Sequence, residues 1–105
     1  MKLALGTAQF GQPYGVANTL GQVSSGEIKS ILRYCEASSI STIDTAIDYG
    51  SSEASLGKAG VNGFDVISKI PAIPMQCFDI DNWVNKQIEI CLNMMIALND
   101  FINLL

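Results

Sequence analysis

Short apolar segments alternate with amphipathic segments along this chain of 105 residues, and this alternation restricts the possible folds more than any other feature. Four apolar segments bounded by turn residues are typical of strands: Lys2–Gly6, Ser41–Ala46, Phe64–Lys69 and Phe101–Leu105. Helical segments are predicted between them, over about 24–37, 53–58 and 79–98. Strands that alternate with helices predict parallel pairing through right-handed crossovers, and hence an α/β fold.

Two of the helical segments have clear start signals and a continuous apolar face. Ser24 and Glu27 have the Ser-x-x-Glu spacing of a capping box. Either Asp79 or Asp81 can cap the last helix. The apolar positions of that helix follow steps of four and three: Val84, Ile88, Cys91, Met95 and Leu98.

The β-α-β-α-β-α-β order is compatible with a small open sheet or with the first half of a (β/α)8 barrel. A complete barrel takes about 250 residues, so this chain would form less than half of one. Parallel strands are normally covered on both faces, yet no helical segment follows Phe101–Leu105. We therefore expect residues 1–105 to form a single, truncated half-barrel.

Composition excludes several classes of function. Six basic side chains against ten acidic ones give a net charge of −4, and the six are scattered, so no groove for nucleic acid is expected. No apolar run is long enough for a membrane span, and the start of the chain does not resemble a signal peptide. The absence of histidine, with three cysteines and no C-x-x-C pair, argues against a metal site. These features predict a soluble, reduced, cytoplasmic protein.

Candidate functional residues lie where the predicted strands end, because active sites of α/β folds collect at the carboxyl ends of the strands. Asp44 and Lys69 end two strands, and Tyr49 lies on the loop between them. A lysine cation beside a tyrosine makes the phenol a better proton donor, and a paired aspartate holds the lysine in place. The three residues could protonate a carbonyl oxygen, although a capping aspartate, a solvated lysine and a packing tyrosine would have the same spacing.

Other site chemistries have weaker support in the sequence. The G-x4-G spacing of Gly6 and Gly11 suits a phosphate loop, but Gln12-Pro13 replaces the required Lys-[Ser/Thr]. No G-x-G-x-x-G follows a strand, which excludes the Rossmann dinucleotide motif. Lys69 alone could form a Schiff base, but that chemistry gives Asp44 and Tyr49 no role.

Several motifs together resemble the aldo/keto reductases. They are Leu5-Gly6-Thr7-Ala8-Gln9-Phe10-Gly11, Ile43-Asp44-Thr45-Ala46-Ile47-Asp48-Tyr49-Gly50-Ser51-Ser52-Glu53, Leu56-Gly57 and Ser68-Lys69. The segment Tyr14–Asn18 is similar to bacterial members of sugar and polysaccharide pathways. The resemblance implies a (β/α)8 barrel that uses NADP(H) to reduce a small aldehyde or ketone, here one derived from a sugar.

The resemblance also implies roles for single residues. Tyr49 would be the proton donor, Lys69 would assist it, and Asp44 would orient Lys69. Gly6, Thr7 and Asp44 would lie near the nicotinamide and its ribose. No metal is implied.

The sequence departs from the family pattern in ways that affect activity. The family's catalytic histidine and its clamp for the 2′-phosphate and adenine have no counterpart here, so we expect the chain alone to be inactive. Ser39 stands where the family usually has glycine before the second strand. Alternatively, the chain is a non-catalytic interaction module that self-associates through open sheet edges.

Overall fold

The computed structural model describes residues 2–13, 21–95 and 102–104 and confirms the predicted α/β alternation. The strands are β1 (Ala4–Gly6), β2 (Thr42–Asp44), β3 (Asp65–Ser68) and β4 (Ile102–Leu104). The helices are α1 (Ala8–Gly11), α2 (Ser25–Ala37), α3 (Ser52–Ala59) and α4 (Ile80–Met95). Helix α1 was not expected, since the glycine-rich sequence after Thr7 predicts an irregular loop. Leu98, Phe101 and Leu105 lie outside the described residues.

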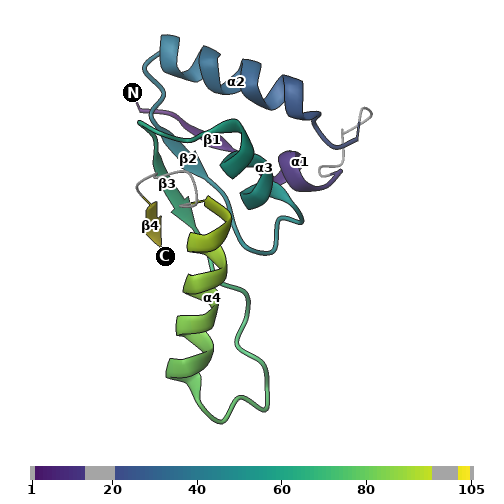
Figure 1. The fold of residues 1–105 in the computed structure, drawn as a ribbon, viewed down its shortest axis with the longest axis vertical. Coiled ribbons are helices and arrows are strands. Elements are labelled where there is room, and N and C mark those ends of the chain that lie inside the picture. Colours follow the sequence, from purple (N-terminus) through teal and green to yellow (C-terminus); the bar gives the residue numbers. More distant parts are fainter. Residues whose placement is uncertain (1, 14–20, 96–101, 105) are drawn as a thin grey trace.

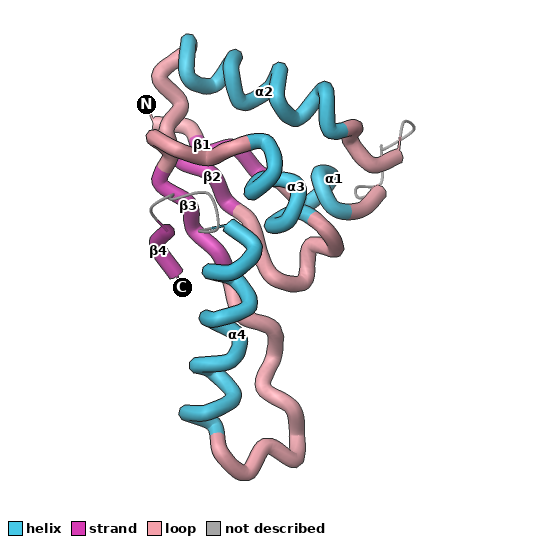
Figure 2. Tube along the Cα trace, viewed as in Figure 1, coloured by secondary structure: helices cyan, strands magenta, loops and turns pink. Residues whose placement is uncertain are grey.

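The four strands form one parallel sheet in the order β1-β2-β3-β4. The register places Gly6, Asp44, Ile67 and Asn103 in one row across the sheet. Figures 1 and 2 show the helices on one face of this sheet. Such an arrangement is that of a half-barrel, in which the helices form the outer layer and the opposite face of the sheet lines the interior.

The core lies between the sheet and the helices, because alternate side chains of β2 and β3 point toward them. Ile43 of β2 and Val66 of β3 are fully buried. The helices cover them with a cluster of apolar side chains that includes Ile28, Leu32, Cys35, Leu56, Cys91 and Met95.

The ends of the helices follow the local sequence signals. The Ser24 hydroxyl accepts a hydrogen bond from the Glu27 amide at 3.3 Å, which confirms the predicted cap of α2. Asp79, rather than Asp81, caps α4, since its carboxylate accepts from the Asn82 amide at 3.0 Å. Helix α2 closes with a pair of backbone bonds, from Ile40 N to Cys35 O and from Ser39 N to Glu36 O. These bonds form a Schellman motif, with Ser39 at the left-handed position (φ 61°).

Helix α4 is buried only toward its carboxyl end. Cys91 and Met95 have 1% and 0% exposure, whereas Val84 and Ile88 on the same predicted seam are only half-buried. The first turns of α4 and the loop before them extend away from the rest of the molecule (Figure 1). No helix within the described ranges is long and apolar enough to cross a membrane.

Candidate active site

Alternation along β2 and β3 divides the strand-end residues between two environments. Asp44 and Lys69 lie on the face away from the helices and are partly exposed. Their chain neighbours Thr45 and Ser68 face the helices and are buried, with 0% and 1% exposure. Backbone bonds beyond the strands, from Thr45 N to Ile67 O and from Ile47 N to Lys69 O, keep the two ends aligned.

Lys69 forms an ion pair with Asp44. The Lys69 Nζ lies 2.7 Å from Asp44 Oδ1 and donates a second bond, 2.8 Å long, to the carbonyl oxygen of Thr45. The side chains are 41% and 39% exposed, and exposed pairs of this kind contribute about 0–1 kcal/mol to stability. The main effect of the pair is therefore to fix the position of the amine.

Tyr49 completes the group on the turn after β2. Its ring centroid lies 5.4 Å from Lys69 Nζ, within the range of a cation–π contact. The turn is closed by backbone bonds from Tyr49 N to Ala46 O and from Ser52 N to Tyr49 O. The structure thus brings Asp44, Tyr49 and Lys69 together, with the amine over the ring of Tyr49. This arrangement can hold a cation beside a phenol at the rim of the sheet.

Gly6 and Thr7 follow β1 at the same rim but differ in accessibility. A Cβ on Gly6 would meet nothing within 4 Å, so the backbone there is open to a ligand. Thr7 is fully buried, and both its amide and its hydroxyl donate to the carbonyl oxygen of Asp44, at 3.1 and 3.0 Å. Thr7 therefore tethers β1 to β2, and its role in binding a cofactor stays a prediction. Among the described residues, no three His, Cys, Asp or Glu side chains are grouped so as to hold a metal ion.

A buried cluster of three hydroxyls lies behind this rim, and no motif in the sequence predicts it. The Ser52 Oγ lies 3.0 Å from Thr45 Oγ1 and donates to Thr7 Oγ1 at 2.9 Å and to Thr7 O at 3.1 Å. Ser52 directly precedes the helical segment that the sequence predicts over 53–58, and its burial depends on the packing of α3 against the strand ends.

Glu53 is a second buried polar residue whose contacts the sequence does not predict. It is 5% exposed, and its Oε2 accepts from Ser68 Oγ at 2.7 Å and from Cys91 Sγ at 2.9 Å. Burial, followed by the hydrogen bond and charge of Glu53, raises the pKa of the Cys91 thiol to about 12. This thiol stays protonated at neutral pH and serves as a donor.

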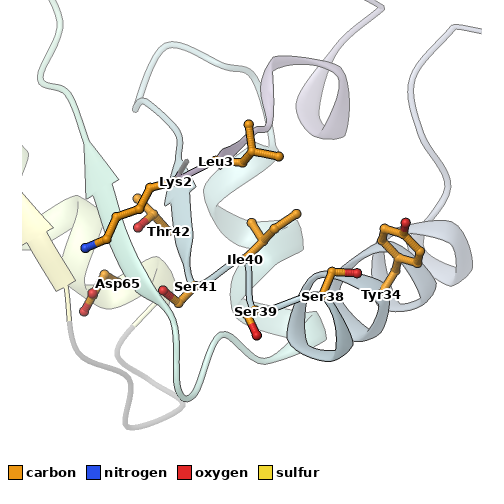
Figure 3. A pocket seen from close by; sticks show the side chains of 9 residues that line it. All are labelled: Lys2, Leu3, Tyr34, Ser38, Ser39, Ile40, Ser41, Thr42 and Asp65. Carbon is orange, nitrogen blue, oxygen red and sulfur yellow. The ribbon is translucent and has the colours of Figure 1, made fainter.

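A hollow of about 480 Å³ lies at the opposite, amino end of the strands. Figure 3 shows its lining: Lys2 and Asp65 lie on one side and Tyr34 on the other. In barrels of this type the amino end contributes to stability and the chemistry occurs at the carboxyl end. The geometry around Asp44, Tyr49 and Lys69 is therefore the candidate active site.

Comparisons with known proteins agree with this architecture. No family model and no curated protein matches the sequence. Two solved structures from Pseudomonas aeruginosa, assigned to the aldo-keto reductases, are similar to it, with 25% and 24% identity and TM-scores of 0.72 and 0.71. Each covers 96% of this chain, which spans only 41% and 40% of their length. The resemblance read from the motifs is confirmed: the chain has the fold of one part of an aldo-keto reductase (β/α)8 barrel.

Proposed function

We propose that residues 1–105 form a single amino-terminal half-barrel that carries the proton-donating side of an aldo-keto reductase active site. The observation that supports this most directly is the position of the Lys69 amine, between the Asp44 carboxylate and the Tyr49 ring. Both charged residues come from the carboxyl ends of neighbouring parallel strands, where barrel enzymes hold their reacting groups.

In the proposed reaction, an aldehyde or ketone binds with its oxygen at the Tyr49 hydroxyl. As the carbonyl carbon gains a hydride, the oxygen gains negative charge and takes the phenolic proton. The Lys69 cation stabilises the phenolate that remains, and Asp44 holds that cation in place. The product is the corresponding alcohol.

The residues present fit one end of a nicotinamide cofactor. Gly6 offers open backbone space, and the partly exposed Asp44 carboxylate can accept a hydrogen bond from a ribose hydroxyl. NADPH would supply the hydride. A reduced, cytoplasmic setting suits this cofactor and the three free cysteines.

The test is a sensitive transfer assay, because the chain has no histidine and steady-state turnover should stay near background. The 105-residue chain is incubated with NADPH deuterated at the transferring position and with small sugar-derived aldehydes. Deuterium in the alcohol is then measured by mass spectrometry. The chain alone is expected to show no steady-state activity, but partial active sites retain residual catalysis from their remaining groups, so a slow transfer above the protein-free rate is expected.

Two variants and one control test whether the transfer depends on Tyr49 and Lys69. Tyr49→Phe and Lys69→Met should reduce the residual transfer to the protein-free rate. Tyr34→Phe, at an exposed tyrosine of α2, should leave it unchanged. Transfer that is absent in the native chain, or that survives Tyr49→Phe, would overturn the proposed function.

The same geometry disfavours Schiff-base chemistry at Lys69. An amine that donates to a carboxylate at 2.7 Å and to a carbonyl at 2.8 Å is committed to these two acceptors, which opposes its attack on the carbonyl carbon of a substrate. We therefore expect no borohydride-trapped adduct of an aldehyde on Lys69, and mass spectrometry of tryptic peptides would detect one.

A further inference from the structure

The first two residues of α3 are buried polar side chains that contact the ends of three strands. Ser52 and Glu53 have 0% and 5% exposure, although they directly follow the exposed Ser51. Both face the layer between the sheet and the helices, opposite the side on which Asp44 and Lys69 lie. Neither residue belongs to the reacting group described above.

Ser52 connects the Tyr49 turn to β1 and β2. Its amide donates to Tyr49 O, and its hydroxyl contacts Thr7 and Thr45. Thr45 is also the residue whose carbonyl accepts from Lys69. One serine therefore fixes the backbone of the proposed proton donor relative to the backbone that holds the lysine.

Glu53 connects the same turn of helix to β3. Its carboxylate accepts from Ser68, which immediately precedes Lys69, and from Cys91 of α4. Removing a partner from a buried carboxylate is costly, so this contact resists displacement of the β3 end. Ser52 and Glu53 together tie α3 to the two strand ends that carry Asp44 and Lys69.

From these contacts we infer that Ser52 and Glu53 are positioning residues that set Tyr49 and Lys69 at their observed separation. Their effect on catalysis rests on the proposed function, whereas their effect on the geometry of Lys69 does not. Loss of the Ser52 hydroxyl leaves Thr7 and Thr45 to rearrange. The Thr45 carbonyl then moves away from the Lys69 amine, and the hydrogen bond between them weakens.

The experiment measures how fast the Lys69 amine reacts in the folded 105-residue chain. An acylating reagent is applied below saturation, and the modified peptides are quantified by mass spectrometry. Four exposed lysines serve as internal references: Lys2, Lys29, Lys58 and Lys86. Ser52→Ala should raise the acylation rate of Lys69 about threefold to fivefold relative to these references, the size expected when a hydrogen bond to a charged group is weakened.

A matched pair of variants separates positioning from general loss of stability. Thr45→Val removes a hydroxyl of the cluster while keeping the shape of the side chain, and it should raise the rate as Ser52→Ala does. Thr45→Ser keeps the hydroxyl and should leave the acylation rate of Lys69 at its native value. Glu53→Gln removes the charge and should also raise the rate. Ser51→Ala alters only exposed contacts and should have no effect.

Global unfolding would increase the labelling of all buried sites and is identified by a destabilised core variant on another helix, Ile28→Val in α2. That variant should leave the Lys69 rate unchanged. Equal Lys69 rates in the native chain, Ser52→Ala and Thr45→Val would overturn the inference. Because the labelling needs no cofactor or substrate, a failed transfer assay would overturn the proposed function and leave this result standing.

Discussion

The carbonyl oxygen of Tyr49 lies directly against the backbone of Gly11, in the space that a Cβ at position 11 would occupy. A Cβ on Gly50 would in turn meet the carbonyl oxygen of Gly11, and Gly50 has a positive φ of 56°. The Ser51 amide donates to Gly11 O at 3.3 Å. Helix α1 is therefore packed against the turn that carries Tyr49, and only glycine at position 11 permits this approach.

Gly11→Ala should displace the Tyr49 turn. The new methyl group meets backbone atoms, which cannot move aside as the end of a flexible side chain can. We expect a loss of about 2–3 kcal/mol in the free energy of unfolding, as for overpacking elsewhere. Urea unfolding measures it. Gly26→Ala in α2 is the control, since its Cβ meets nothing within 4 Å and alanine favours helix by about 0.5–1 kcal/mol. Equal stability of the two variants would refute the close-approach argument.

Ser39→Gly should stabilise the chain. Ser39 is at the left-handed position of the Schellman motif after α2, with φ 61°, where a residue with a Cβ is strained. We expect a gain of about 0.5–1 kcal/mol in the free energy of unfolding, measured by urea or thermal melts.

Ser38→Gly is the matched control for this prediction. Ser38 is the neighbouring exposed serine, but its φ is −98°, which serine adopts without strain. Glycine there only increases the entropy of the unfolded chain and should lower stability. A loss at position 39 of the same size as at position 38 would show that the backbone of Ser39 is unstrained in solution.

Stability should fall at alkaline pH because of Cys91. Its pKa is about 12 in the folded chain against an ordinary value of 9.0, so above pH 9 the unfolded chain releases the thiol proton first. The folded state then binds more protons, and the free energy of unfolding falls as pH rises, by at most about 1.4 kcal/mol per pH unit from this group. Burial raises the pKa of Cys35 as well, which acts in the same direction.

Cys91→Ser isolates this contribution, since serine can still donate to Glu53 but does not titrate in this range. The difference in unfolding free energy between the native chain and Cys91→Ser should change steadily from about pH 9 upward. A difference that stays constant with pH would contradict the raised pKa of Cys91.

The sequence predicts those features that depend on local chemistry and strand order. The cap at Ser24 follows from a four-residue motif, and the meeting of Asp44 with Lys69 follows from parallel strands whose carboxyl ends share one rim. Burial of Ser52 and Glu53 depends on how α3 packs, and a serine or glutamate at a helix start is usually solvated. Gly11 has no local signal either, because its neighbour Tyr49 is distant in the sequence.

The last prediction concerns association of the 105-residue chain in solution. Strand β1 has a partner only on its β2 side among the described residues, and its first residue follows an exposed Leu3. Helix α4 exposes three large apolar side chains, Ile80, Ile90 and Met94, at 51%, 43% and 47%. Open parallel edges and apolar patches favour association, since both are normally covered.

We therefore expect sedimentation velocity to show dimers or larger species whose proportion increases with concentration. The double variant Ile90→Lys and Met94→Lys should shift the distribution toward monomer with little change in thermal stability, because both side chains are exposed on α4. Lys29→Ala, at an exposed position of α2, is the control and should leave the distribution unchanged. A native chain that is monomeric at all concentrations and melts in one sharp transition would show that the half-barrel closes its own core.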